Sequence, residues 1–232
     1  MKPEIIVALD VPNAAALPPL LARLPPEIGW FKIGLELFIA EGPAIVKDLV
    51  ARRKRVFLDL KLHDIPRTVA HAVTAAGRLG ASLMTVHAGG GRAMMKAAAE
   101  AAAAFGPSAP KLVAVTTLTS LNDDDLADLG VQRSLADQAL ALTELALSSG
   151  LHGVVTSVHE AAALRQRFGP APILVTPGIR PAGGDVGDQK RVATPAAAVK
   201  AGATYLVIGR PIVEANDPMQ AGKAILKEIQ DA

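Results

Sequence analysis

The chain of 232 residues contains no cysteine. This absence excludes disulfide bonds, thiol nucleophiles and zinc sites built from cysteine ligands, and it fits a protein of a reducing compartment. Aromatic residues make up only 3% of the sequence, so the chain lacks the stacking platforms with which many proteins hold single-stranded nucleic acid. The composition therefore argues against a disulfide-stabilised secreted protein and against a nucleic-acid-binding one.

Long apolar runs and strong net charge are also missing. No run approaches the roughly 18 apolar residues of a membrane helix, and the N-terminal segment MKPEIIVALDVP lacks the apolar core and cleavage site of a signal peptide. The formal net charge is only +2, and the basic run RRKR at 52–55 follows a helical pattern, so we interpret it as a solvated helix end. We therefore expect a cytoplasmic protein that does not bind membranes or nucleic acid.

Half of the residues are hydrophobic, and they are grouped in a repeating order. Short segments rich in Val, Ile and Leu, typical of strands buried on both faces, lie at 5–10, 30–35, 55–61, 82–88, 111–118, 153–157, 172–178 and 204–210. Helical patterns alternate with them at 14–24, 36–53, 67–80, 91–106, 134–150, 159–169, 194–202 and 217–229. This order predicts an α/β protein, a single (β/α)8 TIM barrel over residues 1–232.

An open, doubly wound parallel sheet is the alternative architecture. It commonly carries G-x-G-x-x-G after its first strand, but LDVPNAAAL stands there in this chain. The glycine run at 89–91 is a weak candidate for a nucleotide loop. The barrel is therefore the preferred prediction.

Charged residues gather where predicted strands end, which is the end of a barrel that carries active sites. Asp10 and Lys32 end the first two strands, Asp59 and Lys61 lie on the third, and Asp64 follows it. Leaving a buried charge unpaired costs several kcal/mol. These groups therefore form either a structural ion-pair network or a site that does chemistry, and their position on three neighbouring strands favours the site.

A second group of candidates lies late in the chain. The segment TPGIRPAGGDVGDQKR (176–191) is a long loop after the seventh strand, and the eighth strand ends in VIGRPI (207–212). These two loops bind phosphate in many barrels. Arg210 offers a charge-assisted fork beside Gly209, and Arg180 and Gln189 could reach in from the loop. The alternative is that the loop only connects and that Arg210 caps a surface.

The histidines do not suggest a metal site. No two of them share a metal-binding spacing on one predicted element. Strand alternation places His63 on the face of Asp59 and Lys61, and we expect it to hydrogen-bond near that motif. His87 is expected at the end of the fourth strand. Both are interpreted as structural.

Taken in order, six segments resemble the orotidine 5′-phosphate decarboxylase family in its bacterial form. They are ALD (8–10), FKIGLELF (31–38), FLDLKLHDIPRTV (57–69), VTTLTS (115–120), TPGIRP (176–181) and VIGRPI (207–212). The D-x-K-x-x-D-I-P stretch is highly specific, and the resemblance spans the whole chain. It implies a homodimer that converts orotidine 5′-phosphate to UMP and CO2 in pyrimidine biosynthesis, without metal or cofactor.

The resemblance also implies a role for each matching residue. Lys61 is implied to be the proton donor to a C6 carbanion, within a charged array that includes Lys32, Asp59 and Asp64. The residues implied to complete the neighbouring subunit's site are Asp64, Ile65 and Thr68. Those implied to contact the substrate within the chain are Asp10, Lys32 and Asp59 near the ribose and reacting carbon, Thr119, Ser120 and Pro177 near the pyrimidine, and Arg180, Gln189, Gly209 and Arg210 near the phosphate.

One departure and two alternatives remain. Arg67 stands where the family commonly has Asn, and it could alter the dimer contact. Sugar-phosphate decarboxylases or synthases of the same superfamily share the D-x-K-x-x-D stretch but use Mg²⁺, with an acidic ligand where this chain has Lys32. A non-catalytic nucleotide-binding barrel would need the anion site without the charged array.

Overall fold

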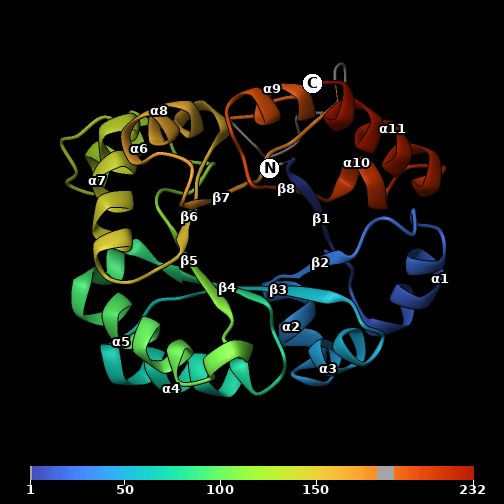
Figure 1. Cartoon of the computed structure of the whole chain (residues 1–232), viewed down its shortest axis with the longest axis horizontal. Helices are drawn as coiled ribbons and strands as arrows, with labels where there is room; N and C mark the ends of the chain where they lie inside the picture. The colour runs from blue at the N-terminus through green and yellow to red at the C-terminus, as the bar shows by residue number, and fades with distance from the viewer. Residues whose placement is uncertain (1, 182–190) are drawn as a thin grey trace.

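The computed structural model describes residues 2–181 and 191–232, and it confirms the predicted barrel. Within these residues, parallel strands close in sequence order into a ring, with β8 hydrogen-bonded to β1 (Figure 1). The strands are β1 (Glu4–Ala8), β2 (Trp30–Ile33), β3 (Arg55–Leu62), β4 (Leu83–His87), β5 (Lys111–Val115), β6 (Gly153–Val155), β7 (Ile173–Thr176) and β8 (Tyr205–Ile208). Most are shorter than predicted, because the polar residues at their ends already belong to loops.

Helices surround the ring on the outside (Figure 1). They are α1 (Leu17–Ala22), α2 (Leu35–Glu41), α3 (Ala44–Ala51), α4 (Pro66–Gly77), α5 (Gly91–Ala103), α6 (Asp123–Asp128), α7 (Leu135–Ser148), α8 (Val158–Phe168), α9 (Pro195–Lys200), α10 (Arg210–Val213) and α11 (Pro218–Asp231). The predicted helix 36–53 is wrong as one element, since Gly42 adopts φ 65° and Pro43 follows it. The short helices α6 and α10 were not predicted.

Apolar side chains form two cores on opposite faces of the strands. One face of each strand packs outward against the helices, as Val7 and Leu58 do. The other face fills the ring interior with a smaller cluster. The fully or largely buried members of that inner cluster are Ile6, Ala8, Trp30, Phe57, Leu83, Val113, Val175 and Val207. This two-residue alternation leaves the next inward positions toward the strand ends for polar side chains.

The two ends of the ring differ in character. At the end where the strands begin, the Arg55 guanidinium lies over the Trp30 ring and is hydrogen-bonded to the Glu4 carboxylate, 2.5 Å away. The Trp30 ring also meets Tyr205 edge-on, with 5.2 Å between centroids. These contacts close that end, so the space for a site lies at the opposite end. None of the helices in the described residues is long and apolar enough to cross a membrane.

Gly153 is required by the close approach of β6 and β7. A Cβ atom at this position would lie 1.9 Å from the carbonyl oxygen of Ile173, so the two strands would have to separate. We predict that Gly153→Ala lowers the free energy of unfolding in urea by about 1–3 kcal/mol, the usual cost of overpacking. Gly29→Ala is the matched control, because its Cβ would meet only the Arg55 guanidinium, at 3.5 Å. Equal unfolding midpoints for the two variants would contradict the prediction.

Candidate active site

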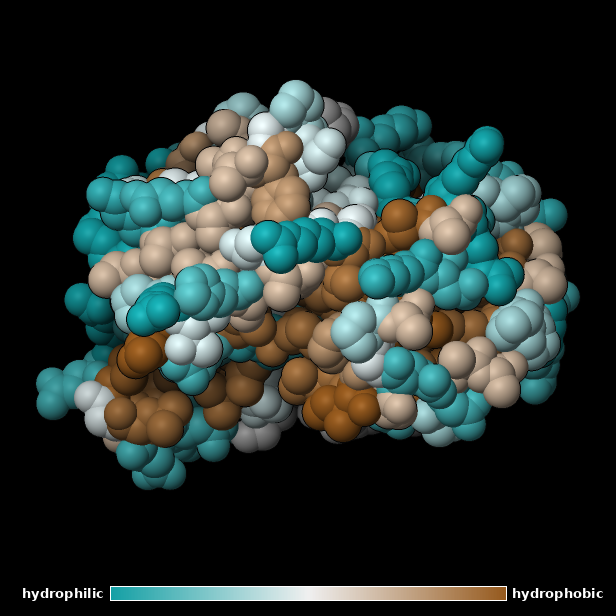
Figure 2. Space-filling view, turned by 90° about the horizontal axis from the view of Figure 1, so that it is seen from below, coloured by the Kyte–Doolittle hydropathy of each residue, from teal (hydrophilic) through white to brown (hydrophobic). Residues whose placement is uncertain are grey.

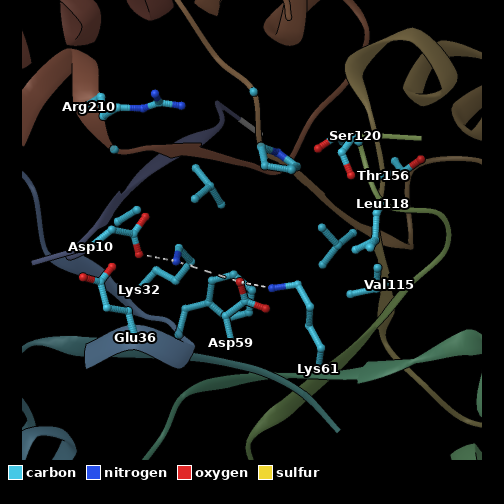
Figure 3. A pocket seen from close by; sticks show the side chains of 18 of the residues that line it. Asp10, Lys32, Glu36, Asp59, Lys61, Val115, Leu118, Ser120, Thr156 and Arg210 are labelled. Atoms are coloured by element: carbon cyan, nitrogen blue, oxygen red, sulfur yellow. Dashed lines mark hydrogen bonds and ion pairs between the residues drawn. The ribbon is translucent and has the colours of Figure 1, made fainter. Parts of the chain in front are cut away.

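A cavity of about 640 Å³ opens where the strands end (Figure 3). Most of the residues proposed from the sequence line it, and they come from different strands. Those that line it are Asp10, Lys32, Asp59, Lys61, Thr119, Ser120, Pro177, Arg180, Gly209 and Arg210. The structure thus brings together groups that are up to two hundred positions apart in the chain, as the strand-end rule for barrels predicts.

Four charged groups form a chain of alternating sign along one wall of this cavity. This ion-pair chain consists of Asp10, Lys32, Asp59 and Lys61. The Lys32 Nζ lies 2.9 Å from the Asp10 Oδ1 and 4.0 Å from the Asp59 Oδ2, and the Lys61 Nζ lies 2.9 Å from the same Asp59 oxygen (Figure 3). The side chains of Lys32 and Asp59 are only 12% exposed. Every charge here has an opposite neighbour, which offsets the cost of its desolvation.

The backbone of Lys61 departs from ideal strand geometry. Its φ is 51°, in the left-handed region that non-glycine residues seldom adopt. Leu58 pairs with Met84 and Leu62 with Val86, so four steps along β3 match only two along β4. Because this bulge adds two residues, it keeps the alternation of faces: Leu58, Leu60 and Leu62 pack on the outer core, and the Lys61 ammonium points at the Asp59 carboxylate. A strained residue at such a place is typical of a functional site.

Thr85 of the neighbouring strand β4 stabilises the bulge. Its role was not predicted from the sequence. Its Oγ1 accepts a hydrogen bond from the Lys61 backbone N–H at 2.8 Å and donates one to the Asp59 Oδ1 at 3.0 Å. The residue is 1% exposed. One buried hydroxyl thus satisfies the N–H that left the strand ladder and orients the carboxylate that holds Lys61.

Gly34 has an equally local reason for its identity. A Cβ atom on it would lie 2.8 Å from the Lys32 Nζ and 3.2 Å from the Asp10 Oδ1. Any side chain there would therefore press on the pair that begins the ion-pair chain. Both atoms are the ends of flexible side chains, so a Cβ atom at Gly34 would displace the Lys32 ammonium from its place in the ion-pair chain.

The opposite wall of the cavity is less charged. Leu118, Ser120 and Thr156 lie across from Lys61, and the Arg210 side chain lies on another side of the opening (Figure 3). Thr156 directly follows β6. No site residue was proposed from the sequence for β6 or β4, although the rule that active-site residues lie at strand ends points to Thr156. Two further carboxylates, Glu36 and Glu214, line the cavity and were also missed.

Asp64, Ile65 and Thr68 do not line the cavity of this chain. All three are exposed, at the start of α4, and Ile65 is 67% exposed. Two more large apolar side chains, Leu35 and Ile39, are exposed on α2. Figure 2 views the molecule from the side of α3, α4 and α5 and shows apolar groups spread across the lower and middle parts of this face, between polar ones. Gln189 lies outside the described residues.

The two histidines near the motif are structural in a way that differs from the expectation for His63. Within residues 2–181 and 191–232 the expected hydrogen bond of His63 is not seen; its ring stacks on that of His87 at 5.0 Å between centroids, nearly parallel. The His87 Nδ1 accepts a hydrogen bond from the Gly89 N–H. Burial lowers the pKa of His87, and the charges of His63 and Lys61 lower it further. Among the described residues, no group of His, Asp and Glu side chains has the arrangement of a metal site.

Comparison with known proteins agrees with this geometry. Residues 3–225 match the model of a family described as "Orotidine 5'-phosphate decarboxylase / HUMPS family". The chain belongs to this family.

Members of the orotidine 5′-phosphate decarboxylase family resemble the chain over nearly its full length. An enzyme of that name from Moorella thermoacetica is 52% identical over 99% of this chain and 93% of its own length. One from Escherichia coli is 50% identical over 97% of this chain and 92% of its own. The crystal structure of the Lactobacillus acidophilus enzyme superposes with a TM-score of 0.87 at 40% identity, covering 98% of this chain and 99% of the other.

The role assigned to Thr85 leads to a prediction. Thr85→Val keeps the shape of the side chain but leaves the Lys61 N–H and one Asp59 oxygen without their partner. We predict that the free energy of unfolding falls by about 1–3 kcal/mol, and that kcat/KM falls with it because Asp59 is no longer held. Thr85→Ser retains the hydroxyl and is the matched control. Urea unfolding and the decarboxylation assay measure the two effects, and a valine variant as stable and active as the serine variant would rule out this role.

Proposed function

We propose how this chain carries out the reaction of its family, the decarboxylation of orotidine 5′-phosphate to UMP and CO2 in pyrimidine biosynthesis. Lys61 is the proton donor, and the reaction needs neither metal nor cofactor. The observation that carries the proposal is the position of the Lys61 ammonium in the cavity, 2.9 Å from the Asp59 carboxylate at the end of the ion-pair chain.

The reaction is difficult for an electronic reason. When CO2 leaves C6 of the pyrimidine, the electron pair of the broken bond stays on C6 in the plane of the ring, where the π system cannot delocalise it. The site must therefore stabilise this charge with groups that are already in place before the bond breaks. The Lys61 ammonium beside C6 supplies the opposite charge and then transfers its proton to C6, which gives UMP.

The rest of the ion-pair chain keeps Lys61 in place. The Asp59 carboxylate accepts a hydrogen bond from the ammonium at 2.9 Å and holds it in one position. Asp59 is held in turn by Thr85 and by the charge of Lys32. Because these groups are positioned by three strands, little reorganisation accompanies the development of charge at C6. Asp10 and Lys32 also present polar atoms to the ribose hydroxyls at the same wall.

The remaining walls bind the ends of the substrate. Ser120, with Thr119 and Pro177 beside it, contacts the pyrimidine, and Arg210 and Arg180 bind the phosphate next to Gly209. Gln189 is assigned to the phosphate and the base on the resemblance alone. The phosphate is remote from the bond that breaks, but its binding free energy can be used to hold the base against Lys61.

The position of Lys32 argues against the Mg²⁺-dependent alternative. Its ammonium lies between two carboxylates, 2.9 Å from Asp10 and 4.0 Å from Asp59. A divalent cation bound by these oxygens would face two lysine charges at short range, which is unfavourable for Mg²⁺ coordination. The carboxylates of this wall, which could have served as Mg²⁺ ligands, are thus already paired with Lys32 and Lys61.

The active unit is proposed to be a homodimer in which Asp64, Ile65 and Thr68 complete the neighbour's site. The exposure of all three, outside the cavity of their own chain, supports this assignment. Leu35 and Ile39 follow Lys32 of the charged wall closely in the sequence. Both are exposed, and they form apolar surface that a second copy could cover. Arg67 lies on the exposed start of α4 and belongs to the same surface.

Replacement of Lys61 tests the proposed chemistry. Lys61→Ala removes both the proton donor and the charge beside C6, and we predict a loss in kcat of more than about 10⁴-fold, since each effect alone is worth about 10²–10³ or more. The assay follows the ultraviolet absorbance of orotidine 5′-phosphate, with and without EDTA. Lys96→Ala, which removes an exposed lysine of α5, is the control. Turnover of the Lys61 variant at near wild-type rate, or loss of wild-type turnover in EDTA, would refute the proposal.

Mixing two inactive variants tests the shared site. Lys61→Ala and Asp64→Asn are each expected to be almost inactive as homodimers. In a mixed dimer, one site combines Lys61 of the Asp64→Asn chain with Asp64 of the Lys61→Ala chain, so it is intact. We predict that unfolding and refolding the two together restores about a quarter of wild-type activity. No recovery, with mixed dimers demonstrated by mass spectrometry, would place Asp64 in its own chain's site or outside any site.

A further inference from the structure

An ion pair buried beside the cavity connects a helix with two loop segments, and no proposed substrate contact explains it. Glu160 of α8 is 7% exposed, and the Arg191 side chain is 13% exposed. The Arg191 Nη1 donates a hydrogen bond to the Glu160 Oε1. The Arg191 Nη2 donates a second one to the backbone carbonyl of Leu118, at 3.2 Å. The guanidinium therefore joins the segment before α9 to α8 and to the loop between β5 and α6.

Each partner of this pair reaches residues that line the cavity. The second oxygen of Glu160 accepts hydrogen bonds from the Ser157 N–H, at 2.9 Å, and from the Thr156 hydroxyl, at 3.2 Å. Thr156 lines the cavity, and so does Leu118. The Leu118 carbonyl also accepts a hydrogen bond from the Leu121 N–H, which closes the turn that carries Thr119 and Ser120. The pair thus stands directly behind the wall opposite Lys61.

We propose that Arg191 and Glu160 are positioning residues that hold the Leu118–Leu121 turn and Thr156 against the pyrimidine. This inference rests on the proposed function, because it assigns that wall to the base. Neither residue touches the substrate. Arg191 holds the turn through the Leu118 carbonyl, and Glu160 holds Thr156 through its hydroxyl, so both sides of the wall depend on one buried pair.

A buried ion pair can also be purely structural, so the test must separate position from stability. Removing one partner leaves a buried charge unpaired and can unfold the protein. The double variant Glu160→Gln/Arg191→Met avoids this, because it removes both charges and the glutamine oxygen can still accept from Ser157. Arg191→Lys keeps the charge, but one ammonium nitrogen replaces the two guanidinium nitrogens that bind Glu160 and the Leu118 carbonyl.

Arg165 offers a matched control on the same helix. Its guanidinium binds the carbonyl oxygens of Gly202 and Pro172, both at 2.7 Å, and contacts nothing that lines the cavity. Arg165→Lys therefore replaces an arginine that, like Arg191, links separate segments of the chain, but that lies toward the other end of α8. Its effect on urea unfolding is expected to match or exceed that of Arg191→Lys, with kcat/KM within about twofold of wild type.

The expected result is a kcat/KM for orotidine 5′-phosphate that is about 10- to 100-fold lower in Arg191→Lys and in the double variant, as for other small misplacements of a reacting group. Hydrogen exchange at the Leu121 amide should become faster in both, but not in Arg165→Lys. Wild-type kcat/KM in the double variant, or unchanged exchange at Leu121, would overturn the positioning role. A wild-type chain without decarboxylase activity would contradict the proposed function instead, and the exchange result would still decide this inference.

Discussion

The attraction between Asp59 and its two lysines is the interaction on which the site depends. Asp59 is nearly buried, and it receives the Lys61 ammonium and the Thr85 hydroxyl while Lys32 lies 4.0 Å away. A carboxylate in this place without its cations would be unfavourable by several kcal/mol. The charges therefore stabilise one another only in the arrangement that the barrel imposes, which makes the geometry of β1, β2 and β3 part of the chemistry.

That arrangement includes a strained backbone at Lys61, the proposed proton donor. A non-glycine residue in the left-handed region costs about 1–3 kcal/mol, and Lys61 adopts φ 51°. The bulge that contains it releases the Lys61 N–H from the ladder, and the Thr85 hydroxyl then accepts this N–H. The strain is sustained because β3 is hydrogen-bonded on both sides and packed between two apolar cores. The strain energy at Lys61 is thus offset by the hydrogen bonds and apolar packing of the rest of β3.

The sequence predicted most of the architecture because the signals for it are local. Continuous apolar strands, amphipathic helices and their alternation are visible in short windows, and the rule for strand ends then places Asp10, Lys32 and Asp59 together. Even the break between α2 and α3 was visible, at Gly42 and Pro43, and was overlooked because the helical pattern continues across it.

The features that the sequence did not reveal depend on contacts between distant segments. Thr85 lies on the neighbouring strand, and its importance follows only from the bulge opposite it. Arg191 and Glu160 stand 31 positions apart, and although Arg191 ends the segment 176–191, nothing in the sequence connects it with Glu160. Strand alternation could not show that the His63 ring stacks on that of His87, because this contact depends on the pairing of β3 with β4. Tertiary register, rather than composition, is the missing information in each case.

The proposed sharing of Asp64 gives the assembly a chemical reason. The ion-pair chain of one subunit contains two carboxylates and two ammonium groups, so it is neutral as a whole. In the proposed dimer, a carboxylate from a second subunit adds a negative charge that attracts the Lys61 ammonium. Within a single chain, Asp64 is exposed and solvated, with one oxygen on the Ile65 N–H, so it imposes no burial cost before association. In the proposed dimer, covering apolar surface such as Leu35 and Ile39 would offset the cost of bringing a third carboxylate near the substrate, and the full set of charges would exist only in the assembled enzyme.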